Sequence, residues 1–81
     1  MYPDKTFSFV DTQVYRFLVS ILETHSRGVS SHGIIAKTLI ENLRLRGFSG
    51  LDIGGSLNFL IRKGILNMQV VEDKIYFQFV E

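Results

Sequence analysis

Hydrophobic side chains recur every three or four residues in three separate stretches of the chain, the spacing of amphipathic helices. We expect these helices at residues 8–26, 31–46 and 50–63. Ser8 with Asp11, and Ser49 with Asp52, have the spacing of capping boxes at two of the helix starts, and Asp11 is an alternative N-cap for the first. Ser30 is the expected N-cap of the middle helix. Glycines follow the expected helix ends, at Gly28, Gly47 and Gly64.

The period of the pattern changes from 3.6 to 2 after the third stretch, which predicts a β-hairpin over residues 65–80. A two-residue turn at Glu72–Asp73 would align three apolar pairs on one face. The pairs are Val70 with Ile75, Met68 with Phe77, and Leu66 with Phe79. An isolated hairpin is marginally stable, so we expect this face to cover the helices. A short strand near Val29 would add a third, edge pairing.

The composition supports one small globular domain spanning residues 1–81. The net charge is only +1, which is low for a domain that binds phosphates. The absence of cysteine favours a reducing, intracellular location and excludes disulfides and thiolate metal sites. Neither a metal site nor a cofactor motif is recognisable, and no catalytic set stands out, so we expect a binding protein rather than an enzyme. No small-molecule substrate is expected, because a domain this small has little room for a walled active site. No membrane association is expected, because no apolar run is long enough to span a bilayer.

The third stretch and the residues after it carry a family resemblance. The pattern Ile53-x-x-x-Leu57-x-x-Leu60-x-x-Lys63-Gly64-Ile65-Leu66 resembles the recognition helix and following wing of winged helix-turn-helix proteins. The order of elements is also similar to the globular domain of linker histones. The resemblance implies an α+β winged helix, a three-helix bundle with a C-terminal two-stranded hairpin; a generic α+β domain is the alternative. It further implies binding to double-stranded DNA, with the third helix in the major groove. The turn Glu72-Asp73-Lys74 departs from the family pattern, since a wing that contacts phosphates is usually basic.

Several residues could serve such a DNA interface. At 100° per residue, Gly55, Asn58 and Arg62 fall opposite the apolar side of the third helix. Asn can pair with adenine and Arg with guanine, and glycine permits close approach of the backbone to the groove. Phosphate contacts are expected from basic side chains and from the free N–H groups at the start of the second helix. These candidates are Lys37, Arg44, Arg46, Lys63, Ser30, Ser31 and His32. The alternative is that these residues form an ordinary solvated surface without a binding role.

Phe59 supports a competing hypothesis. The helical phase places it beside Leu51 on the outer side of the third helix, where an exposed aromatic patch would bind a protein partner or a second copy of the chain. Alternatively, Phe59 packs against the chain around Phe7 and Phe9. The sequence therefore predicts a small DNA-binding transcriptional regulator or architectural factor. The alternative is a winged-helix protein-interaction or dimerisation module that does not bind DNA.

Overall fold

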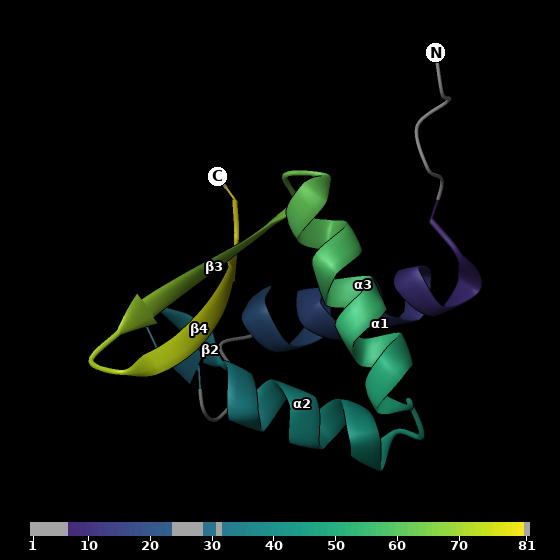
Figure 1. The fold of residues 1–81 in the computed structure, drawn as a ribbon, viewed down its shortest axis with the longest axis horizontal. Coiled ribbons are helices and arrows are strands. Elements are labelled where there is room, and N and C mark those ends of the chain that lie inside the picture. Colours follow the sequence, from purple (N-terminus) through teal and green to yellow (C-terminus); the bar gives the residue numbers. More distant parts are fainter. Residues whose placement is uncertain (1–6, 24–28, 31, 81) are drawn as a thin grey trace.

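Within residues 7–23, 29–30 and 32–80, which the computed structural model describes, three helices combine with one antiparallel sheet of four strands. The elements in chain order are α1 (Phe9–Glu23), β1 (Val29–Ser30), β2 (Gly33–Ile35), α2 (Ala36–Leu45), α3 (Gly50–Arg62), β3 (Leu66–Val71) and β4 (Lys74–Phe79). Figure 1 shows α3 crossing in front of α1, α2 running below them, and the β3–β4 hairpin projecting away from the helices. The predicted α+β class is confirmed, and the layout is compatible with a winged-helix arrangement.

Side-chain caps begin α1 and α3 as the sequence predicts. The backbone N–H of Ser8 donates to Oδ2 of Asp11, and the N–H of Asp11 donates to Oγ of Ser8, each at 3.0 Å. Ser8 is therefore the cap of α1. At α3, the N–H of Asp52 donates to Oγ of Ser49 at 3.1 Å. The expected end of the first helix at residue 26, and Gly28, lie outside the described residues.

The hairpin has the predicted register. Leu66 lies opposite Phe79, Met68 opposite Phe77 and Val70 opposite Ile75. Glu72 and Asp73 form the turn with φ of 51° and 67°. Positive φ at both central residues defines a type I′ turn, which twists with the strands and normally favours glycine at the second position.

The start of the second helix is predicted wrongly. The helix begins at Ala36 rather than at residue 31, because Gly33–Ile35 form strand β2. Ile34 pairs with Phe77 and Ile35 with Tyr76. These two residues therefore join the sheet, although their apolar side chains would also fit the buried side of a helix. Ser30 is consequently not the N-cap. Ile35 occupies that position and has no side-chain cap hydrogen bond.

The short strand expected near Val29 is present as β1, with a different partner. Strand order is β1-β2-β4-β3, so β1 lies at one edge and pairs with β2. Strand β2 is the one that joins the hairpin. Gly33 makes this possible, because it has φ +103° and a Cβ there would collide with the carbonyl oxygen of Phe77.

The core lies between the helices and the base of the sheet. Its buried hydrophobic residues are Val14, Phe17, Leu18, Ile34, Leu39, Leu43, Ile53, Leu57, Phe59, Leu60, Leu66 and Phe77. Along β3 the apolar face leaves this core: Leu66 is 1% exposed, Met68 50% and Val70 66%. The expectation that the whole apolar face covers the helices is therefore correct only for the base of the hairpin. In the described ranges, no helix combines the length and the apolar character needed to cross a membrane.

Replacing Gly33 with alanine should lower the free energy of unfolding by at least about 2 kcal/mol, because it combines a positive φ with a collision against Phe77. Gly54→Ala is the matched control. Nothing lies within 4 Å of a Cβ at this exposed helical position, and alanine should stabilise by up to about 1 kcal/mol. Urea unfolding followed by circular dichroism measures both. Equal effects of the two substitutions would contradict the close approach of β2 to β4.

Replacing Asp73 with glycine should raise the free energy of unfolding by about 0.5–1 kcal/mol, because glycine relieves the left-handed conformation of the turn. Lys74→Gly, at the first residue of β4, should instead destabilise the protein, because glycine weakens a strand. Thermal unfolding distinguishes the two. A loss of stability in Asp73→Gly would argue against the type I′ turn.

Candidate nucleic-acid interface

One side of α3 is exposed along the whole length of the helix. Leu51, Gly55, Asn58 and Arg62 are exposed, and we call these four residues the α3 stripe. The opposite side of α3 is buried, and its residues are Ile53, Ser56, Leu57, Phe59 and Leu60. Helix α1 packs against the buried side, so the α3 stripe faces away from α1. The structure therefore brings Gly55, Asn58 and Arg62 together on an accessible surface, as the helical phase predicts.

Phe59 is buried, which corrects the expectation of an exposed aromatic beside Leu51. Its side chain is only 6% exposed. The ring of Phe7 meets it edge-on, with centroids 5.0 Å apart and an interplanar angle of 85°. The alternative packing against the chain before α1 is thus confirmed for Phe7, whereas Phe9 is exposed. Phe59 lies at the border of the buried side of α3, and Phe7 extends that side far enough to cover it.

A buried hydrogen bond fixes the orientation of α3 on α1. Oγ of Ser56 donates to Oδ1 of Asp11 at 2.7 Å, and both residues are buried. The other carboxylate oxygen of Asp11 accepts the capping hydrogen bond from Ser8. The side chain of Asp11 therefore takes part in the capping of α1 and also binds α3. This contact holds α3 with the α3 stripe on its outer side. The sequence shows the capping role of Asp11, but nothing in it connects Asp11 with Ser56.

Arg44 lies beside the first residue of α3, Gly50. Its Nη2 atom is 3.2 Å from the position that a Cβ on Gly50 would occupy. Lys37 precedes Arg44 by two helical turns and shares its face of α2, with exposed Glu41 between them. At the other end of α3, Nζ of Lys63 lies 5.8 Å from the ring centroid of Phe59. A cationic side chain thus lies near each end of α3.

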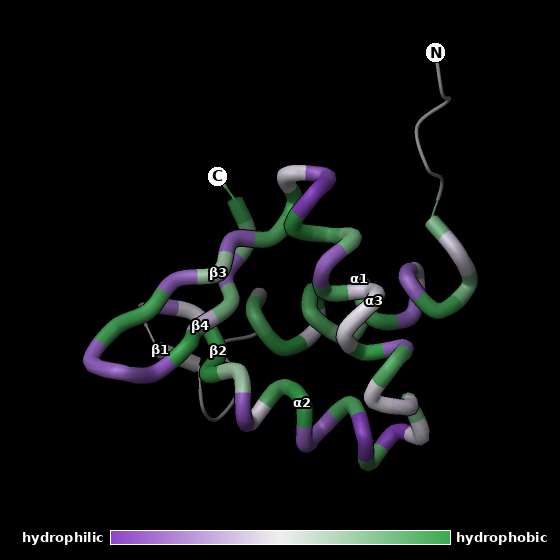
Figure 2. Tube along the Cα trace, viewed as in Figure 1, coloured by the Kyte–Doolittle hydropathy of each residue, from purple (hydrophilic) through white to green (hydrophobic). Residues whose placement is uncertain are grey.

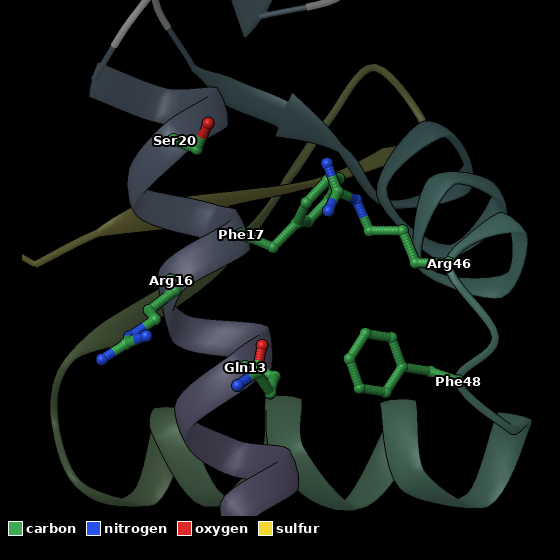
Figure 3. Close-up of a pocket in the computed structure, with 6 residues that line it drawn as sticks. All are labelled: Gln13, Arg16, Phe17, Ser20, Arg46 and Phe48. Carbon is green, nitrogen blue, oxygen red and sulfur yellow. The ribbon is translucent and has the colours of Figure 1, made fainter.

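Arg46 belongs to a different surface. Its guanidinium carbon lies 4.4 Å from the ring centroid of Phe17 on α1. A pocket surrounds this contact, lined by Gln13, Arg16, Phe17, Ser20, Arg46 and Phe48. Figure 3 shows Arg46 reaching across the ring of Phe17, whereas the guanidinium of Arg16 points away from it. Arg46 is therefore on the α1 side of the molecule and not beside the α3 stripe. Gln13 and Arg16 also line this pocket, and their positions along the sequence of α1 give no signal of it.

Ser30 and His32 do not form the start of a helix, which corrects their predicted role in a phosphate site. Ser30 is in β1, and Ser31 lies outside the described residues. His32 is in the connection to β2, where its carbonyl oxygen accepts a hydrogen bond from Nε2 of Gln69 at 3.2 Å. Its ring lies 5.5 Å from that of Tyr76. The free N–H groups on which the prediction depended belong instead to the start of α2 at Ala36.

Comparison with known proteins adds no family assignment: no family model, no curated protein and no solved structure matches this chain. Within the part of the chain that the structure describes, no group of three or more His, Cys, Asp or Glu side chains could hold a metal ion. The geometry of the α3 stripe is consequently the basis for any functional argument.

Replacing Ser56 with alanine should lower the free energy of unfolding by about 1–3 kcal/mol, because it removes a buried donor from the carboxylate of Asp11. Asn58→Ala, at an exposed position two residues along α3, should change stability by less than about 0.5 kcal/mol. Chemical denaturation of the two variants tests this difference. An Asn58→Ala loss as large as that of Ser56→Ala would place Asn58 in the folded core.

Proposed function

We propose that this chain is a winged-helix domain that binds double-stranded DNA, acting as a small transcriptional regulator or architectural factor rather than as an enzyme. The order of one helix, two short strands, two helices and a hairpin supports the winged-helix assignment. The pairing of β2 with β4, the second strand of the hairpin, supports it further. In this arrangement α3 is the helix that enters the major groove.

The observation that carries the proposal is the α3 stripe. Gly55, Asn58 and Arg62 are exposed on one side of a helix whose other side is buried. Nothing lies within 4 Å of a Cβ added at Gly54 or Gly55, so the outer backbone of this helix is open to approach. Asn58 can then pair with adenine, and Arg62, one turn further on, with guanine.

Phosphate contacts in this proposal come from the ends of the helix. A helix of 13 residues is about 20 Å long. Arg44 near its start and Lys63 just after its end would contact the DNA backbone on either side of the groove. Lys37 continues the Arg44 side along α2. The hairpin turn is acidic at Glu72 and Asp73, so the wing contributes little to phosphate binding.

A protein-interaction module is the second candidate. Leu51 is 90% exposed and Leu45 85% exposed, and exposed leucines at the α2–α3 corner favour an apolar partner. Phe59, the residue expected at the centre of such a contact, is buried in the core and cannot bind a partner. The α3 stripe therefore supports DNA better than it supports a protein partner.

Fluorescence anisotropy of a labelled mixed-sequence duplex, measured at several salt concentrations, tests DNA binding. We expect dissociation constants of about 10⁻⁴–10⁻⁶ M that rise steeply with salt. No binding at low salt would contradict the proposal and direct attention to a protein partner for Leu51.

Arg62→Ala then tests the role of the α3 stripe, on a duplex sequence selected from a random library. We expect a loss of about 1–3 kcal/mol in binding free energy if Arg62 contacts a base. Lys74→Ala is the matched control, because it removes the same charge from the exposed start of β4. Equal losses in the two variants would show a general charge effect and remove Arg62 from the interface.

A further inference from the structure

Strand β3 is an open edge of the sheet. In the strand order β1-β2-β4-β3 it is the outermost strand, and its six residues exceed the two of β1 at the opposite edge. Natural proteins usually protect such edges with charges, proline, bulges or very short strands. The segment Leu66–Val71 reads LNMQVV and contains no charge, proline or glycine. Its register with β4 is unbroken over all six residues. The edge therefore has none of these protections.

The backbone groups of alternate β3 residues point outward. The carbonyl oxygen of Ile65 accepts a hydrogen bond from the N–H of Val80 at 2.9 Å, so Ile65 bonds toward the β4 side. Bonding direction alternates along an antiparallel strand. Leu66, Met68 and Val70 consequently direct their N–H and C=O groups away from β4, where no strand of the described ranges pairs with them.

We propose that β3 pairs antiparallel with β3 of a second copy of this chain, in a register centred on Met68, to form a continuous eight-stranded sheet. Outward-pointing residues must pair with one another, and side chains of paired residues lie on the same face. Centring the two-fold axis on Met68 meets both conditions. It pairs Met68 with Met68 and Leu66 with Val70 of the second copy. The polarity of Leu66-Asn67-Met68-Gln69-Val70 reads the same in both directions, so every pair matches apolar with apolar or amide with amide.

The apolar surface left outside the core supports the same partner. Met68 is 50% exposed and Val70 66% exposed, although both lie on the face of the hairpin whose base is buried. In Figure 2, hydrophobic segments of both strands of the hairpin continue almost to its hydrophilic tip, well clear of the helices. Pairing at the edge places Val70 of each copy beside Leu66 of the other, close to the core of that copy.

Charge favours this register as well. Antiparallel pairing centred on Met68 directs the turn Glu72–Asp73 of one copy toward the segment that precedes β3 in the other. That segment contains exposed Lys63. Two acidic side chains therefore approach a basic one at each end of the paired strands, and β3 itself contributes no like charges to the pairing. The pairing does not depend on DNA binding.

Sedimentation equilibrium of the full chain measures the pairing, with Met68→Lys and Ile75→Lys compared at the same concentrations. We expect the unmodified protein to reach twice the chain mass of 9.3 kDa. Met68→Lys should sediment as a monomer, because it sets two like charges directly opposite each other. Ile75→Lys is the matched control: it adds the same charge to an exposed residue of β4, which is not an edge strand, and it should remain a dimer. A monomeric unmodified protein, or a dimer that persists in Met68→Lys with the native circular dichroism spectrum, would overturn the proposal.

Single cysteines test the register, because the chain contains none. Paired residues on the two-fold axis have Cα atoms about 5.5 Å apart, within the range of about 4.4–6.8 Å that a disulfide spans. Met68→Cys should therefore cross-link into a covalent dimer under mild oxidation or with a short bifunctional thiol reagent. The two copies of position 70 are offset by four residues, about 13 Å, so Val70→Cys should remain uncross-linked. Cross-linking through position 70 in preference to 68 would overturn the register.

Discussion

The pairing of β2 with β4 holds the C-terminal hairpin onto the helices, and the rest of the domain depends on this contact. Ile34 lies opposite Phe77, and both side chains are buried in the core. A two-stranded hairpin has little stability of its own. Its position is fixed by pairing with β2, which leads directly into α2, and by packing of its base on α2 and α3. Gly33 allows the two backbones to approach, since any side chain there would meet the carbonyl of Phe77. The same contact determines where α2 can begin.

The elements whose signals are local could be predicted from the sequence. The caps at Ser8 and Ser49 depend on residues three positions away, and the register of the hairpin follows from its alternating pattern and short turn. The start of α2 could not be predicted in this way. Ile34 and Ile35 fit a helical stripe and a buried strand equally well, and the deciding contact is with Tyr76 and Phe77, some forty residues further along the chain.

In the candidate interface too, local patterns predict some positions correctly, and contacts between distant segments decide the others. Helical phase alone correctly places Gly55, Asn58 and Arg62 on the exposed side of α3. It fails for Phe59, which lies at the border of the buried side and is covered by Phe7 from the segment before α1. The placement of Arg46 was predicted wrongly for a related reason. The number of charges on two helices does not say in which direction each side chain points, and Arg46 contacts Phe17 rather than α3. Sequence periodicity thus identifies which residues share a face, while contacts between distant segments decide which faces remain open.

The two adjacent glycines in α3 affect both the accessibility of the helix backbone and the folding of the helix. Each glycine makes the free energy of helix formation about 1 kcal/mol less favourable than alanine does. Gly54 and Gly55 both lie in the half of α3 nearest its start. The order of that half is therefore provided by its neighbours, through Ile53 and Leu57 in the core and Ser56 on Asp11. A ligand that binds the outer surface of α3 would further stabilise the helical conformation of this half. Its binding would therefore raise the melting temperature of the whole domain. The openness of the backbone and the conformational entropy of the helix are two consequences of the same missing side chains.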